Sequence, residues 1–323
     1  MSEALLWGAA AAVIAAVAGG PLIRFLKGRR LGKAISTDGP ESHLSKEGTP
    51  TMGGLLFMTV GLALSLAVAV PQDGDVLLPV AVGALLLLAG MYDDAGTLIE
   101  RGKREAHDRV NMILKLLVFA GVGTAAALIL YYSIEPPELL VPHYGSYDIG
   151  SVYIAVAIAT FVATTASVGV TDGLDMLLGS ISAVVFAAFG TLALLQGDDA
   201  LGALCFIMAG ALTGFLFWNA HPARLFMGDA GSLPLGGMIA VVALMSGWWL
   251  LLPLVGVIFV AEGASVAIQI AYFRTTGGKR FFRMAPIHHH FEKLGYHETT
   301  ITMRFLAVTI TAALAGIGLA VLD

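Results

Sequence analysis

Apolar segments of membrane-spanning length recur from one end of the 323-residue chain to the other. A helix needs roughly 20 mostly apolar residues to cross the hydrocarbon core of a bilayer. The sequence contains about ten such segments, and no stretch between them is long enough for a separate water-soluble domain. It therefore predicts a single all-α, polytopic integral membrane domain over residues 1–323. The expected spans cover residues 4–26, 52–71, 76–92, 111–133, 150–170, 176–195, 200–218, 232–247, 249–273 and 302–322.

The composition agrees with this class. Hydrophobic residues make up 57% of the chain and charged residues 13%, whereas soluble domains carry about 25% charged residues. The first apolar segment lacks the basic leader and cleavage site of a signal peptide, so we expect it to be a retained span. The single Cys205 lies in an apolar run, which excludes disulfides and cysteine-ligated metals.

The basic residues indicate an orientation. All 18 Lys and Arg residues fall in or beside four alternate connections, at 24–46, 101–115, Arg224 and 274–304. The other connections carry only acids. Because basic loops face the cytoplasm, we expect both termini to be extracytoplasmic and the polar chemistry to form a cleft on the cytoplasmic side.

Two of the cytoplasmic segments contain possible ligands for ions. Lys46 and Thr51 precede a glycine pair at a helix entrance, where free backbone N–H groups bind anions; a capped helix start explains them equally well. Asp93 and Asp94 end the third span. Adjacent carboxylates suit a divalent cation or proton transfer, although an ordinary helix-end pair is the alternative.

Two further segments bring acids close to the bilayer. The connection Thr171–Asp175 contains Asp172 and Asp175 within a few residues, which favours a cation or a ligand hydroxyl. In the next cytoplasmic loop, Asp229 follows a glycine and is a strong metal-ligand candidate. Phe226, three residues earlier, either stacks on a base or packs internally.

The last cytoplasmic loop contains His288, His289 and His290 in a row. Three consecutive side chains cannot all face one way on a helix or a strand. Zinc ligation is one interpretation, but no cysteine or spaced histidine pair supports it. Hydrogen bonding to a phosphate or a sugar is favoured. Magnesium binds through a few carboxylates plus substrate phosphates. Together, these loops predict a Mg²⁺-dependent phosphotransferase with a membrane-resident acceptor.

The same segments carry a resemblance to a known family. HLSKEGTPTMGG, the Asp93–Asp94 pair, TDGLD, GFLFWNAHPARLFMGDAGSLPLG and YFRTTGGKRFFRMAPIHHHFE occur in the expected order between about residues 32 and 304. The chain resembles the phospho-N-acetylmuramoyl-pentapeptide transferases (MraY, translocase I) of the polyprenyl-phosphate N-acetylhexosamine-1-phosphate transferase superfamily. APIHHHFE distinguishes this muramoyl branch from the N-acetylglucosamine branch.

The resemblance implies ten spans, a homodimer and a multi-pass protein of the bacterial inner membrane, in contact with membrane lipids and with no nucleic-acid partner. It implies transfer of phospho-MurNAc-pentapeptide from UDP-MurNAc-pentapeptide to undecaprenyl phosphate, which gives lipid I and UMP for peptidoglycan synthesis. The roles that it implies are metal ligation by Asp229, catalysis by Asp93, Asp94, Asp172 and His288, and substrate binding by Lys46, Thr51, Asp175, Asn219, Phe226, His289 and His290.

Five positions depart from the family pattern. Ser167 and Gly169 replace an Asn-x-x-Asn-Leu pattern, Met176 replaces a glycine, and Thr97 and Asn111 replace lysines. Losing an amide and two cations beside a diphosphate weakens charge-assisted bonding, so we expect a lowered turnover. The alternatives are a catalytically impaired paralogue that keeps the uridine and metal pocket, or a transferase for another UDP-amino sugar. A transporter is disfavoured, since apart from Glu262 the spans carry little charge and no inverted repeat is evident.

Overall fold

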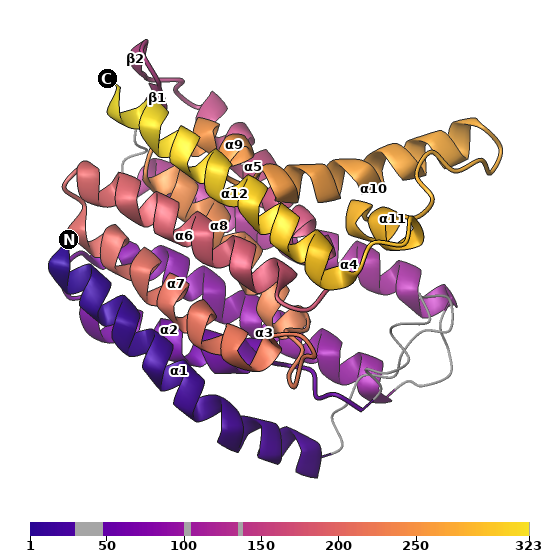
Figure 1. Cartoon of the computed structure of the whole chain (residues 1–323). Helices are drawn as coiled ribbons and strands as arrows, with labels where there is room; N and C mark the ends of the chain where they lie inside the picture. The colour runs from indigo at the N-terminus through magenta and orange to yellow at the C-terminus, as the bar shows by residue number, and fades with distance from the viewer. Residues whose placement is uncertain (30–47, 100–104, 135–137, 323) are drawn as a thin grey trace.

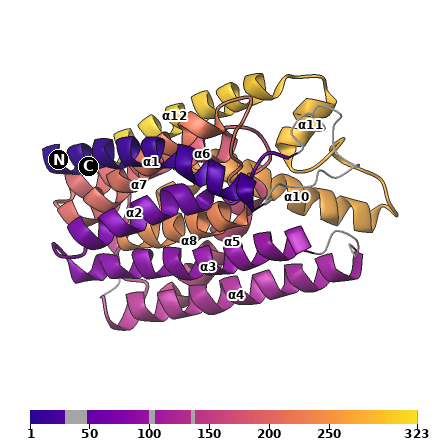
Figure 2. The same ribbon diagram turned by 90° about the horizontal axis from the view of Figure 1, so that it is seen from below.

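The computed structural model of the chain describes residues 1–29, 48–99, 105–134 and 138–322. These residues form a bundle of long helices (Figure 1). The first helix begins and the last helix ends at the same end of the bundle, and the short helix with the three histidines lies at the opposite end (Figures 1 and 2).

Most of the described residues belong to helices. The helices are α1 (Ser2–Gly28), α2 (Gly54–Val68), α3 (Leu77–Ile99), α4 (Glu105–Tyr132), α5 (Val152–Val170), α6 (Leu177–Leu195), α7 (Asp199–Asn219), α8 (Asp229–Met245), α9 (Leu252–Val255), α10 (Val257–Thr275), α11 (Ile287–Lys293) and α12 (Glu298–Val321). Two 3₁₀ turns, η2 (Gly74–Val76) and η3 (Trp249–Leu251), precede α3 and α9.

The prediction of a polytopic helical membrane protein is confirmed. Within the described residues, eight helices are long and apolar enough to cross a membrane. Two further apolar helices are shorter: α2 has 15 residues and α8 has 17. In hydrocarbon every backbone N–H and C=O needs a partner within the protein, and a helix supplies these partners within one segment. Apolar length alone therefore predicts helices here.

Three details differ from the sequence prediction. Asp93 and Asp94 do not end the third helix, because α3 continues to Ile99 without a helix-breaking proline. The ninth predicted span is interrupted: Pro253 lies in the first turn of the short α9, and Gly256 separates α9 from α10. The chain is also not entirely helical. Strands β1 (Leu139–Val141) and β2 (Gly145–Tyr147) form an antiparallel hairpin between α4 and α5.

Helix α8 is the centre of the bundle. It packs against α2, α3, α5 and α6, and its residues from Ala230 to Leu244 are all buried. Glycines on two neighbouring helices permit close approach to its first turn. A Cβ on Gly90 of α3 would overlap the backbone carbonyl of Asp229, and a Cβ on Gly54 of α2 would overlap the backbone of Ala230. Small residues at helix contacts are the usual means of close packing in membranes.

Candidate active site

The amino-terminal turn of α8 begins the candidate site. The segment before α2 pairs with the segment before α8: Phe226 donates its N–H to Pro50 (2.8 Å), and Gly53 donates to the carbonyl of Phe226 (2.7 Å). Thr51 is buried, and its hydroxyl lies beside Gly228, where a side chain would collide with it. Thr51 and Phe226, two of the predicted site residues, are thereby brought together at the start of α8.

Asp94 caps this turn. Its Oδ1 accepts a hydrogen bond from the backbone N–H of Asp229, and its Oδ2 accepts one from Ala230, both at 3.1 Å. The first N–H groups of a helix have no partner within the helix and carry partial positive charge. The buried carboxylate of Asp94 satisfies two of them, so α3 fixes the position of the Asp229 backbone.

Asp93 and Asp229 face a common cation. Lys115 Nζ of α4 lies 3.0 Å from Asp93 Oδ2 and 2.5 Å from Asp229 Oδ2. Ser232 Oγ lies 3.5 Å from the other carboxylate oxygen of Asp229. Three helices thus bring two carboxylates and an ammonium group to one point, and each of these side chains is partly exposed.

This donor set suits Mg²⁺. Magnesium prefers oxygen ligands and is commonly held by one or two carboxylates together with substrate phosphates. Asp93 and Asp229 supply such carboxylates, and the ammonium of Lys115 already occupies a position that attracts positive charge. The residues present therefore fit a divalent cation, with Lys115 as its competitor in this arrangement.

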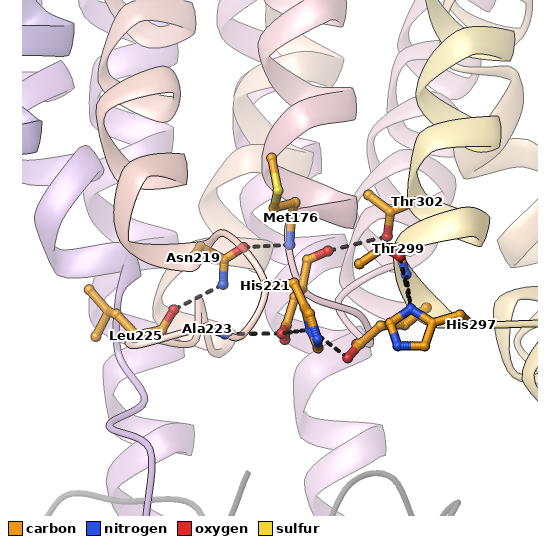
Figure 3. Close-up of polar contacts among 10 residues, drawn as sticks. Met176, Asn219, His221, Ala223, Leu225, His297, Thr299 and Thr302 are labelled. Carbon is orange, nitrogen blue, oxygen red and sulfur yellow. Dashed lines mark hydrogen bonds and ion pairs between the residues drawn. The ribbon is translucent and has the colours of Figure 1, made fainter. Parts of the chain in front are cut away.

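Asp175 belongs to a second cluster of polar contacts, and Figure 3 shows His221 and Ala223 of this cluster. The buried Oδ2 of Asp175 accepts a hydrogen bond from the backbone N–H of Ala223 at 3.0 Å and lies 2.9 Å from His221 Nδ1. Glu298, in the first turn of α12, lies 2.8 Å from the same nitrogen. The ligand atoms of Asp175, His221 and Glu298 lie within 4.8 Å of one another. They join the α5–α6 connection, the loop before α8 and the start of α12.

Asn219 joins the same loops. Its Oδ1 accepts the N–H of Met176 (2.8 Å), and its Nδ2 donates to the carbonyl of Leu225 (2.9 Å), as Figure 3 shows. A buried amide with both ends satisfied fixes the backbone on either side. Asn219 therefore holds the loop before α8 against the end of the Thr171–Asp175 connection, in which Asp172 is partly exposed.

The three histidines of α11 point to three different partners, as the sequence predicted for consecutive residues. His288 is buried, and its Nδ1 lies 3.0 Å from Glu262 Oε2 of α10. His289 Nδ1 lies 2.6 Å from Glu292 Oε2, and His290 Nδ1 accepts the N–H of Arg283 at 3.1 Å. His288 lies against Gly173 of the Thr171–Asp175 connection.

The positions that depart from the family pattern have different surroundings. Met176 adopts φ 67°, ψ −15°, a left-handed conformation that glycine adopts without strain. Among the described residues, a Cβ on Gly169 would meet only Leu233, at 3.6 Å, so a side chain fits there. Ser167 packs against Gly263 of α10. Lys46 lies outside the described residues, and the side chains of Thr97 and Asn111 lie outside the described part of the chain as well.

Sequence reasoning did not assign His221, Glu298 or Glu262 to the site. His221 stands inside a quoted motif, and Glu262 is an acid within an apolar span, which is a recognisable signal because such acids are costly. Nothing in the sequence distinguishes Glu298 as a site residue, since acids are common in the first turn of a helix.

Two models of known families match parts of the chain. Residues 76–247 match Glycosyl transferase family 4, and residues 46–58 match the phospho-N-acetylmuramoyl-pentapeptide-transferase signature 1. The second match covers Thr51 and the glycines before α2. The first extends from the 3₁₀ turn before α3 to the end of α8 and includes Asp93, Asp94 and Asp229.

Curated relatives cover almost the whole chain. A phospho-N-acetylmuramoyl-pentapeptide-transferase of Chloroflexus aurantiacus is 40% identical over 100% of this chain and 90% of its own length. The Moorella thermoacetica enzyme is 40% identical over 98% of both chains. The Clostridium novyi enzyme is 38% identical over 94% of this chain and 93% of its own. The chain belongs to the phospho-N-acetylmuramoyl-pentapeptide-transferase family, a family of membrane transferases.

Proposed function

We propose that the chain transfers phospho-MurNAc-pentapeptide from UDP-MurNAc-pentapeptide to undecaprenyl phosphate and releases UMP. The observation that carries the proposal is the full-length match to curated transferases of this name. The meeting of Asp93, Asp229 and Lys115 at the start of α8 supports it, because phosphoryl transfer requires carboxylates and cations gathered at one point. The relatives do not favour an impaired paralogue or a transferase for another sugar.

Asp229 and Asp93 would hold Mg²⁺ in this proposal. When bound, the ion supplies positive charge that balances the diphosphate of the donor substrate. Lys115 would keep a positive charge beside the two carboxylates. Asp94 would act as a catalytic group at the amino-terminal end of α8, where each of its carboxylate oxygens accepts a hydrogen bond from a backbone N–H group.

The nucleotide would bind on the side of Asp175. Asp175 and Phe226 are assigned to uridine, Asp172 to the diphosphate, and Lys46, Thr51 and Asn219 to the walls of the cleft. His288 would act near the phosphates, and His289 and His290 would contact the sugar-peptide part. The support is the set of contacts that join the Thr171–Asp175 connection to the loop before α8.

A single assay tests the transfer. Purified protein is incubated with UDP-MurNAc-pentapeptide, undecaprenyl phosphate and Mg²⁺, and the release of UMP is measured. The substitution Asp229→Asn should abolish release and leave the melting temperature unchanged. Near-normal turnover of that variant would remove Asp229 as the metal ligand, and a wild type that releases no UMP would remove the proposed function.

We further infer ten membrane spans with both termini extracytoplasmic and the cleft facing the cytoplasm. The one-sided distribution of the basic residues supports this topology. Cysteines introduced at positions 198 and 280 should be labelled from opposite sides of the membrane. Labelling of both from the same side would contradict the topology. The family resemblance also supports a homodimer, which the mass of the protein in lipid nanodiscs would test.

A further inference from the structure

A buried Glu–His pair joins α10 to α11, and Glu262, its carboxylate, has no role in the transfer described above. Glu262 belongs to the membrane-spanning helix α10 and is 0% exposed, and His288 of α11 is 1% exposed. Glu262 Oε2 lies 3.0 Å from His288 Nδ1. Among the described residues, neither Glu262 Oε1 nor His288 Nε2 has a hydrogen-bond partner. Buried polar atoms are nearly always paired, so two unpaired atoms in one contact require an explanation.

The free nitrogen faces a functional loop. Of the atoms near a Cβ built on Gly173, His288 Nε2 is the nearest, and the two would overlap. Gly173 is the middle residue of the connection that carries Asp172 and Asp175. The imidazole edge therefore occupies the space that any side chain at position 173 would need.

Burial limits the protonation states of the pair. A single uncompensated charge inside a membrane bundle is costly, so the pair is favoured when it is neutral as a whole. One neutral form is an imidazolium donating Nδ1–H to the Glu262 carboxylate. A second is a neutral imidazole that accepts the acid proton of Glu262 at Nδ1. In both of these forms Nε2 carries a hydrogen. Nε2 is bare in a third neutral form, in which a Glu262 acid protonated at Oε1 accepts Nδ1–H, and in the form that buries a net negative charge.

We propose that Glu262 is a positioning residue of the transfer reaction: it holds His288 with a protonated Nε2 directed at the Thr171–Asp175 connection. This inference rests on the proposed function. The effect comes from the positive charge of the imidazolium, which the Glu262 carboxylate stabilises and which favours anionic groups of a ligand at this connection. This charge attracts the phosphates of a nucleotide and has no such effect on an uncharged nucleoside.

The test compares UDP with uridine. Binding of each ligand is measured by calorimetry in the presence of Mg²⁺ for the wild type and for Glu262→Gln. Glutamine keeps the volume and can still bond to Nδ1, but it cannot hold the charged form. We expect UDP to bind roughly three- to tenfold more weakly, with the affinity for uridine unchanged. Glu262→Asp, which restores a carboxylate, should recover part of the loss.

A matched control is available on the same helix. Ser265 is buried and donates its hydroxyl to the backbone carbonyl of Glu262 (2.7 Å). Ser265→Ala therefore changes a buried polar group one turn away and leaves the carboxylate intact. Its affinities for UDP and uridine should both match those of the wild type. If Glu262→Gln lowered the affinities for UDP and for uridine equally, Glu262 would have a structural role only and the proposal would be overturned. An unchanged affinity for UDP would overturn it as well.

A second measurement needs no change at Glu262. In wild-type protein labelled with ¹⁵N-histidine, with His288→Asn used for assignment, the His288 Nε2 signal should be that of a protonated nitrogen. A bare nitrogen would overturn the proposal. The proposed function fails separately: a wild type that binds neither UDP nor uridine contradicts it, whereas binding that is insensitive to Glu262 contradicts the positioning role alone.

Discussion

Lys115 and Asp229 stand 114 positions apart in the sequence, and their charged groups lie 2.5 Å apart in the structure. The same ammonium lies 3.0 Å from Asp93. A cation already in contact with two carboxylates opposes the binding of a second cation to them. This relationship gives the first prediction, which concerns the affinity of the site for a divalent metal.

The substitution Lys115→Met should tighten metal binding at Asp93 and Asp229. Removing the ammonium relieves charge repulsion on the incoming ion, and we expect the affinity for Mn²⁺ to rise by about three- to tenfold. Electron paramagnetic resonance of Mn²⁺ titrations measures this directly. Lys279→Met, at an exposed position in the loop after α10, is the control and should leave the affinity unchanged. A weaker affinity in Lys115→Met would show that Lys115 does not compete with the metal.

The second prediction concerns the cap on α8. Asp94→Ala leaves the N–H groups of Asp229 and Ala230 without their acceptor, and orphaned buried donors cost about 1–3 kcal/mol each. The melting temperature in detergent should fall. Asp93→Ala is the comparison, since Lys115 still binds Asp229 in that variant. Equal melting temperatures for the two variants would contradict the capping role.

The third prediction concerns Met176, which adopts a left-handed conformation at the start of α6. For a residue with a side chain, this conformation is less stable than the right-handed one by about 1–2 kcal/mol. Glycine adopts it at little cost. Met176→Gly should therefore raise or preserve the melting temperature, although part of the gain is offset by the greater freedom of glycine in the unfolded chain. Met176→Val should lower it, because β-branched residues tolerate positive φ least. The reverse order of the two variants would show that the side-chain contacts of Met176 outweigh its backbone strain.

The fourth prediction concerns Gly169. In the part of the chain that the structure describes, a Cβ there meets only Leu233, at ordinary contact distance, so Gly169→Asn should leave the protein folded. If the amide reaches the phosphates, the rate of UMP release should rise above that of the wild type. Gly236→Asn is the contrasting variant, since a Cβ at that position would lie 2.6 Å from the backbone of Thr165, and it should destabilise the protein. A folded Gly169→Asn variant with unchanged turnover would show that the missing amide is neutral in this chain.

Several features follow from the sequence alone. Each of the predicted apolar segments contains an apolar helix in the structure, because backbone groups in hydrocarbon are satisfied within one helix. The carboxylates that meet at α8 were also identified from the sequence, since acids beside long apolar segments are costly and stand out. The motifs sufficed to indicate the family.

Only the tertiary structure decided which of these groups meet. Lys115 was one of 18 Lys and Arg residues, and His221, Glu298 and Glu262 were not assigned to the site. In the structure Lys115, His221 and Glu262 each contact a predicted site residue, and Glu298 contacts His221. A membrane helix that is apolar on all sides does not indicate which face packs inward. The facing surfaces depend on where glycines such as Gly54 and Gly90 allow two backbones to approach. That choice is made between segments far apart in the chain, so no local pattern in the sequence records it.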